Sequence, residues 1–135
     1  MEVIARYLGA VQFEIKARQH TLICDQPVES NGFDEGMTPP ELLLASLASC
    51  AAFYAVDYLK RNHLLTEGVR AHVTADKVKG PFRLDNFHIT VETPAELSEA
   101  HLKGVDDAVH RCLIHNTLLR PPKIELTIHA PVTAG

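Results

Sequence analysis

The sequence predicts an α+β fold in a single domain spanning residues 1–135, and three observations carry this expectation. Stretches that alternate apolar and polar residues, the pattern of half-buried strands, are segregated from two long helical stretches instead of alternating with them one by one. A length of 135 residues suits one domain. A composition of 46% hydrophobic and 22% charged residues suits a globular chain with its own core.

The N-terminal third predicts three strands, at about residues 2–8, 11–18 and 20–24. In the second of them, Val11, Phe13 and Ile15 alternate with polar residues, as on a sheet with one buried face. The stretch that follows, QPVESNGFDEGMTPP, is rich in turn-forming residues and predicts a loop of more than a dozen residues. Loops this long in a small domain are often functional or act as lids.

A central helix is predicted to begin after Thr38 and to end at about Asn62. Thr38 can cap it, prolines suit its first turn, and Glu41 completes a capping box. From Leu42 to Val56 the helix is apolar on nearly all sides, so we expect protein to enclose it. This uncharged stretch of 15 residues is shorter than the ~18–20 residues of a membrane-spanning helix.

The C-terminal half predicts two more strands, a second helix, a short helical piece and a last strand. The second helix is expected to open with a capping box at Thr93-Pro94-Ala95-Glu96. In the last strand, three apolar residues alternate with polar ones. The expected elements are strands at residues 69–76 and 87–92, helices at 93–110 and 112–119, and a strand at 123–129, whose apolar residues are Ile124, Leu126 and Ile128.

Charge and cysteine content exclude several classes of protein. The net charge is −4, and no basic face suited to phosphates is apparent, so nucleic acid is not an expected partner. The N-terminus carries Glu2 and Arg6 and lacks the apolar core of a signal peptide, and no membrane segment is expected. Three cysteines do not make a disulfide scaffold. We therefore expect a cytoplasmic protein with reduced thiols.

Cys50 lies in the middle of the central helix, and two interpretations are open. A free cysteine is most often a small packed hydrophobe. A reactive thiolate there would need a cation, because the helix start lies about three turns away. Arginine keeps its charge when partly buried, so the candidates are Arg6, Arg18 and Arg111.

Cys112, between the second helix and the short helical piece, has the same two interpretations. Together, Cys50 and Cys112 can form the attacking and resolving thiols of a peroxidase, in which a sulfenic acid condenses with a second thiol. Cys24, in a strand, is expected to be structural. The apolar residues Leu47, Phe53 and Tyr54 beside Cys50 favour a substrate with an alkyl or fatty-acid tail.

No metal site or cofactor is expected. Cys112 and His115 form one C-x-x-H pair, but a structural zinc site needs four ligands. His72, His88 and His129 fall on the polar faces of their strands, where they are expected to be solvated. Glu41 lies nine residues before Cys50, about 900° around an ideal helix, so it could serve Cys50 through a bend or from a second chain.

Two motifs together resemble the OsmC/Ohr family of osmotically inducible and organic hydroperoxide resistance proteins: PPELLLASLASC at residues 39–50 and RCLIHNTL at residues 111–118. The loop with Asp25-Gln26-Pro27, Gly32 and Gly36 and the order of the elements also fit. The resemblance implies an OsmC-like two-layer fold, with antiparallel sheets wrapped around two main helices. It further implies an intertwined homodimer with active sites at the subunit interface.

The resemblance also implies roles for individual residues. Cys50 would be the peroxidatic cysteine and Cys112 the resolving one, while Arg18 and Glu41 are the positions that best match the arginine and glutamate holding the thiolate. The partners would be an organic hydroperoxide and an external dithiol reductant.

Two other functions remain open from the sequence. The same pocket could bind small apolar molecules without catalysis, its cysteines merely packed. Alternatively, disulfide formation could change the shape of a redox sensor without turnover.

Overall fold

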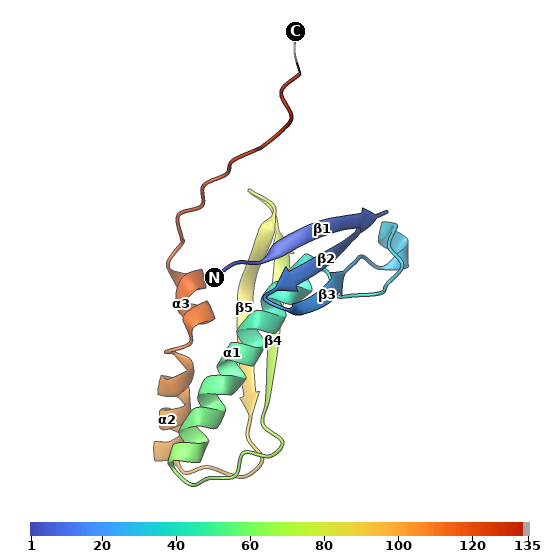
Figure 1. Ribbon diagram of the computed structural model, residues 1–135. Helices are drawn as coiled ribbons and strands as arrows, with labels where there is room; N and C mark the ends of the chain where they lie inside the picture. Colours follow the sequence, from blue (N-terminus) through green and yellow to red (C-terminus); the bar gives the residue numbers. More distant parts are fainter. Residues whose placement is uncertain (134–135) are drawn as a thin grey trace.

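The computed structural model describes residues 1–133 and confirms the α+β fold (Figure 1). It contains a three-stranded and a two-stranded antiparallel sheet together with three α-helices. In chain order the elements are β1 (Ile4–Gly9), β2 (Gln12–Ala17), β3 (His20–Cys24), the 3-10 helix η1 (Val28–Ser30), α1 (Pro39–Arg61), β4 (Arg70–Val78), β5 (Arg83–Glu92), α2 (Glu99–Val109) and α3 (Leu113–Leu119).

The N-terminal sheet has the order β1-β2-β3, close to the predicted ranges. Ile15 in its central strand is paired with Ala5 on one side and Leu22 on the other. Arg18 was predicted to end the second strand, but it lies outside β2 and occupies the β2–β3 turn with a φ of 55°. The reason is that Ala17 already pairs with His20, which leaves only two residues to reverse the chain.

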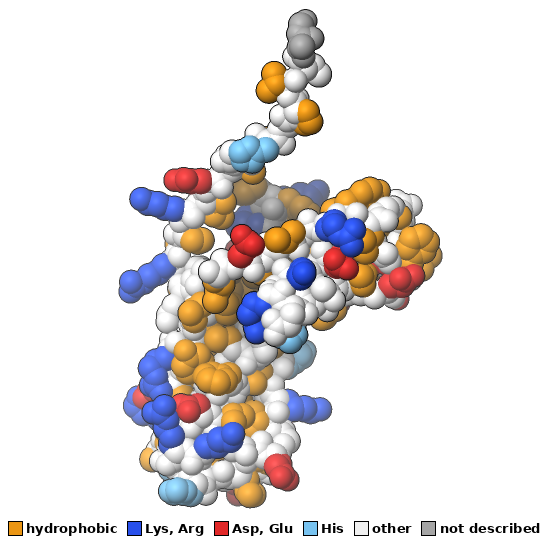
Figure 2. Space-filling view, viewed as in Figure 1, with side chains coloured by type: hydrophobic (Ala, Val, Ile, Leu, Met, Phe, Trp, Pro, Cys, Tyr) orange, Lys and Arg blue, Asp and Glu red, His pale blue; other side chains and the backbone are white. Residues whose placement is uncertain are grey.

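The prediction for α1 is confirmed at both ends, since Thr38 and Glu41 form the capping box and Asn62 is the C-cap. Within one chain, however, the helix is not enclosed: its buried residues lie on one face, and Phe53 is 64% exposed. Figure 2 shows apolar side chains along the side of the molecule where α1 runs. By length and composition alone, the 23-residue helix would suffice to cross a membrane, but here it is the core helix, packed against β4, β5, α2 and α3.

The hydrophobic core lies between α1, α2 and the β4–β5 hairpin. At its centre are Ala55, Leu59 and Val105, surrounded by partly buried side chains from both strands and both helices. The predicted inward residues of β4 and β5 face this core, because Val73 and Ile89 are paired and half-buried while His72 and His88 are exposed. The core thus fixes one face of α1 and leaves its other faces open.

The long loop before α1 is a folded element and not a lid. The carboxylate of Asp25, which is 1% exposed, accepts hydrogen bonds from the Gln12 side chain and from the backbone N–H groups of three loop residues. These three residues are Gln26, Phe33 and Glu35. At Gly36 any Cβ would collide with the carbonyl of Ile23. The loop is therefore wrapped tightly around the end of β3.

The second helix begins later than predicted. The structure starts α2 at Glu99, where the hydroxyl of Ser98 accepts the N–H of His101. The hydroxyl of Thr93 instead donates to the carbonyl of Ala95, and Leu97 packs against the core. Tertiary packing of Leu97 therefore overrides the local capping signal at Thr93.

The predicted last strand does not form. From Arg120 to Thr133 the chain has no regular secondary structure, and Figure 1 shows this segment projecting away from the rest of the molecule. The three apolar residues of the predicted alternation, Ile124, Leu126 and Ile128, are 86%, 84% and 80% exposed. A strand needs a neighbouring strand edge, and no edge in residues 1–133 lies alongside this segment.

Candidate active site

The structure brings Cys50 and Cys112 together. Cys50 projects from the middle of α1, whereas Cys112 is the N-cap residue of α3, at the point where the chain leaves α2. The two thiols are neighbours, and the interaction with Cys50 raises the pKa of Cys112. The packing of α1 against α2 and α3 produces this contact between residues far apart in the sequence.

The two thiols differ in their surroundings. Cys112 has no exposed surface, and its sulfur accepts the backbone N–H of His115 at 3.5 Å. Burial raises the pKa of Cys112, and the interaction with Cys50 adds to this effect, while the N–H groups of His115 and Ile114 oppose it. Cys50 is half-buried. A reagent that approaches from solvent therefore meets Cys50 first.

Cys24 is separate from this pair. It lies at the end of β3, is buried, and forms an isolated parallel bridge with Met37. Burial raises the pKa of its thiol, and the negative charge of Asp25 raises it further. These surroundings agree with the expected structural role.

Glu41 and Arg18 do not reach the thiols within one chain. The Glu41 carboxylate accepts both the N–H and the hydroxyl of Thr38, at 3.0 and 2.8 Å. These bonds lower the pKa of Glu41, and the nearby charge of Lys77 lowers it further. Nine residues along α1 place Glu41 roughly 14 Å from Cys50 along the helix axis. The side chain of Arg18, in the β2–β3 turn, forms no hydrogen bond or ion pair with any residue between 1 and 133.

The other two candidate arginines are engaged elsewhere. Arg6 pairs with Glu14 across β1 and β2 at 3.3 Å, and Arg111 donates to the carbonyl of Asp107. Neither side chain is bonded to a cysteine within the described residues. In a single chain, therefore, none of the three predicted cations is hydrogen-bonded to a thiol.

An apolar cavity of about 620 Å³ lies between α1, β5 and α3. Neither cysteine lines this cavity, but two of its lining residues lie close to them in the sequence: Leu47 is one turn before Cys50, and His115 is one turn after Cys112. Leu47 is among its lining residues, whereas Phe53 and Tyr54, whose rings contact each other edge to face, are not, so their role toward a substrate stays a prediction. The lining residues are Leu43, Leu47, Arg83, Leu84, Asp85, Asn86, Phe87, Ile89, His115, Leu118 and Leu119.

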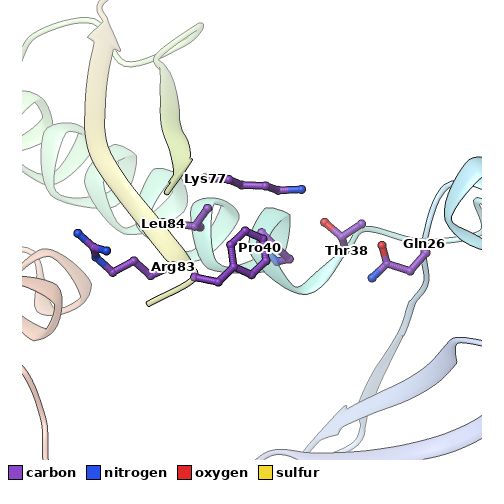
Figure 3. Close-up of a pocket in the computed structure, with 7 residues that line it drawn as sticks. Gln26, Thr38, Pro40, Lys77, Arg83 and Leu84 are labelled. Atoms are coloured by element: carbon purple, nitrogen blue, oxygen red, sulfur yellow. The ribbon is translucent and has the colours of Figure 1, made fainter. Parts of the chain in front are cut away.

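A second cavity, of about 390 Å³, lies at the beginning of α1 (Figure 3). The ammonium of Lys77 points toward Thr38 and Gln26, while the guanidinium of Arg83 points the opposite way. Pro40, at the floor of this cavity, lies ten residues before Cys50, which is about 15 Å along the helix. This cavity is therefore distinct from the surroundings of the thiols.

Two residues at the site were not foreseen in these roles. His115 was considered only as a metal ligand, yet it lines the 620 Å³ cavity, and its Nδ1 is buried without a hydrogen-bond partner in the described chain. Arg83 lines the same cavity and pairs with Asp85 at 3.3 Å. In the sequence, only the C-x-x-H spacing of Cys112 and His115 indicated that His115 lies near the site. No group of three potential metal ligands occurs among residues 1–133.

The fold and the site define a class: an α+β protein of two antiparallel sheets whose core helix presents one thiol to a second, buried thiol. The family model for OsmC-like proteins matches residues 32–127, well over half of the chain. This chain belongs to the OsmC-like protein family.

Solved structures share the fold across most of their length. A Psychrobacter arcticus protein described as an osmotic stress induced and detoxification response protein is 25% identical, covers 85% of each chain and gives a TM-score of 0.77. An OsmC-like protein from Mycoplasma pneumoniae is 24% identical over 87% of this chain and 86% of its own, with a TM-score of 0.71.

A third structure shows the fold at lower identity. The organic hydroperoxide resistance protein OsmC from Legionella pneumophila is 17% identical over 87% of this chain and 89% of its own, with a TM-score of 0.60. A search of curated proteins finds no match.

Proposed function

We propose that the protein is a thiol-dependent peroxidase that reduces organic hydroperoxides, with Cys50 as the peroxidatic and Cys112 as the resolving cysteine. The observation that carries the proposal is the proximity of a half-buried thiol, Cys50, to a fully buried one, Cys112. A half-buried thiol can meet a substrate, and a buried neighbour can meet only the first sulfur. Membership of the OsmC-like family supports a redox role.

In the proposed cycle, the Cys50 thiolate attacks the terminal oxygen of the hydroperoxide. The O–O bond breaks, the alcohol leaves with a proton, and Cys50 becomes a sulfenic acid. The sulfur of Cys112 then attacks that of Cys50, so a disulfide forms and water leaves. An external dithiol returns both cysteines to thiols.

The cavity beside the thiols supports an organic substrate rather than hydrogen peroxide. Most of its lining is aliphatic or aromatic, and each buried CH₂ of a substrate would gain about 0.8 kcal/mol. Its volume of about 620 Å³ lies in the range of small-molecule sites. An alkyl or acyl tail placed there would have its hydroperoxide group directed along α1 toward Cys50.

We further propose that the working unit is a homodimer with intertwined chains. Two features of the single chain are otherwise left without a partner: the open faces of α1 and the exposed alternation of Ile124, Leu126 and Ile128. Exposed apolar surface of this extent is costly in water. A second copy that covers α1 and accepts residues 123–129 as a strand would bury both, and it could also bring Arg18 and Glu41 to the thiols.

The test is consumption of cumene hydroperoxide with dithiothreitol as the reductant. We expect turnover by the wild type and by Cys24→Ser, the matched control, and none by Cys50→Ser. Cys112→Ser should complete one oxidation and then stall or depend on direct reduction of its sulfenic acid. Equal turnover by Cys50→Ser and the wild type would contradict the proposal.

One observation favours a second candidate, a binder of small apolar molecules: the cavity is large and mostly apolar even without a substrate. A binder would retain an apolar fluorescent probe in Cys50→Ser and show no hydroperoxide turnover in the wild type. The two functions are therefore separated by the same set of variants.

A further inference from the structure

We propose that His115 is the acid–base group of the resolving step: it takes the proton of the Cys112 thiol as that sulfur attacks Cys50 and returns it to the departing hydroxide. This inference rests on the proposed function for its natural substrate, but the chemistry of Cys112 can be tested without any peroxide.

The first observation is an unpaired polar atom. The Nδ1 atom of His115 is buried and has no hydrogen-bond partner in the part of the chain that the structure describes. Roughly nine in ten buried polar groups in proteins are paired. The backbone nitrogen of the same residue lies 3.5 Å from the Cys112 sulfur, so an imidazole with an available nitrogen belongs to a residue in contact with the thiol.

The second observation is the position of the ring. His115 is the third residue of α3, whose N-cap is Cys112. Helical side chains lean toward the N-terminus, and side chains at this position reach back to the N-cap residue. The backbone N–H of Cys112 is already bonded to the carbonyl of Val109 at 3.0 Å. The thiol is thus the remaining polar group of the N-cap residue.

The third observation is the burial of the thiol itself. Cys112 has no exposed surface, and burial raises the pKa of its thiol above the ordinary value. Only the thiolate attacks sulfur, and bulk water cannot reach this site to remove the proton. An internal base is needed, and imidazole, with a reference pKa of about 6.5, is suited to that role near neutral pH.

The other titratable groups around His115 are already engaged or solvated. Asp85 pairs with Arg83 and also accepts the N–H of Asn86. The ring of His110 lies 5.4 Å from that of His115, but it is exposed and bonded to the carbonyl of Asp106. His115 lines the 620 Å³ cavity and also a third cavity of about 330 Å³. The titratable groups that line these two cavities are Arg83, Asp85 and His88 from β5, Asp106 from α2 and His110 at its C-cap, and α1 contributes Cys50 on the other side of Cys112.

The step is balanced within these groups. The Cys112 S–H bond breaks, and its proton moves to His115. The sulfur lone pair forms the S–S bond as the S–O bond of the Cys50 sulfenic acid breaks, and the hydroxide takes the proton from the imidazolium to leave as water. No electron acceptor beyond the sulfenic acid is required.

The experiment uses the full chain with Cys24→Ser, so that only the two site cysteines react. Ellman's reagent forms a mixed disulfide at Cys50, and the attack of Cys112 then releases a second thionitrobenzoate. We expect His115→Asn to slow this second release about tenfold or more at neutral pH while leaving the first release unchanged. The matched control His110→Asn should leave both unchanged.

A pH profile supplies a second readout. The difference in second-release rate between the wild type and His115→Asn should change with pH, because a neutral imidazole can accept a proton and a protonated one cannot. Equal second-release rates in the two proteins at every pH would overturn the proposal.

The same variants with cumene hydroperoxide distinguish this inference from the proposed function. Accumulation of the Cys50 sulfenic acid in His115→Asn, trapped by dimedone, supports both. If the wild type consumes no hydroperoxide but the second release still depends on His115, the peroxidase proposal fails and the role of His115 stands.

Discussion

The thiols of Cys50 and Cys112 are neighbours, although one residue lies in the middle of α1 and the other caps α3. The fold therefore brings the pair together in the reduced protein, before any oxidant arrives. Because α1 and α3 are packed against each other, we expect the two sulfurs to form a disulfide without a rearrangement of the fold.

Oxidation with one equivalent of hydroperoxide should produce a Cys50–Cys112 disulfide. Peptide mapping under non-reducing conditions should find this linkage in the wild type and in Cys24→Ser. Cys24 should remain a free thiol because it is buried at the end of β3, away from the pair. A dominant disulfide that contains Cys24 would contradict the assignment of the site.

Arg18→Ala should reduce the peroxidase rate at least about tenfold, which corresponds to about 1.4 kcal/mol of barrier. The physical reason is that a thiolate in apolar surroundings needs a cation that keeps its charge when desolvated, and in the dimer the β2–β3 turn of a second copy would supply it. The rate of iodoacetamide reaction with Cys50 between about pH 6 and 9 measures the thiolate directly.

Arg83→Ala is the informative comparison for Arg18, because Arg83 lines the apolar cavity beside the thiols in the same chain. If Arg83→Ala lowers the reactivity of Cys50 and Arg18→Ala does not, the activating cation is Arg83. Both variants should remain dimeric by light scattering.

Asp25→Asn should destabilise the fold at neutral pH, because an amide cannot accept all the hydrogen bonds that the buried carboxylate accepts. Burial alone would raise the pKa of Asp25, but the bonds from Gln12, Gln26, Glu35 and Phe33 hold it below the ordinary value. The stabilisation is thus fully present above the unfolded pKa of about 3.9 and is lost as the pH falls through the lower folded value.

Urea unfolding at several pH values checks this prediction. The wild type should lose stability on acidification below about pH 4 more steeply than Asp25→Asn. Parallel pH dependences in the two proteins would show that Asp25 does not stabilise the loop through its charge.

Gly104→Ala should destabilise the protein by about 1–3 kcal/mol, against the gain that alanine usually brings to a helix. A Cβ at this position in α2 would overlap the ring of Tyr58, whose hydroxyl is bonded to Nδ1 of His101 at 2.9 Å. Denaturant midpoints measure the effect. The double variant with Tyr58→Leu should recover part of the loss, since the smaller side chain leaves room for the methyl group.

Leu126→Lys should weaken the dimer, whereas Thr127→Lys should not. Both residues are exposed in the single chain, but in a strand their side chains would lie on opposite faces. If this segment is a strand of the partner's sheet, only the lysine at position 126 places a charge in the apolar interface. Sedimentation equilibrium at micromolar concentration measures the difference, and equal dimerisation of the two variants would argue against a strand at residues 123–129.

The sequence predicted best the features that local interactions determine. Thr38 and Glu41 specify the beginning of α1 because their side chains bond to backbone groups only three residues away. Alternation placed β4 and β5 correctly, since the period of two directly reflects which side chains face the core. The prediction for the beginning of α2 was wrong because Thr93 and Ser98 are both good N-cap residues, and only the packing of Leu97 decides between them.

The site was predictable only in part for a similar reason. The two cysteines could be paired from the motifs, but the surroundings of Cys112 depend on how α3 packs against α1. His115 and Arg83 come from separate elements and meet at one cavity only in the tertiary structure. Residues 123–129 show what an alternating pattern cannot predict. The pattern favours a strand, yet a strand forms only where the edge of another strand, in the same or a second chain, can pair with it.

The exposed C-terminal segment also has a consequence for the timing of biosynthesis. Residues 123–129 leave the ribosome after both described sheets and the three described helices have been synthesised. If they complete a sheet in a second copy, that step is a collision between two chains whose other elements are already formed, and its rate depends on their concentration. Newly made subunits would then wait with α1 partly uncovered, and assembly on polysomes carrying several nascent chains would shorten that wait.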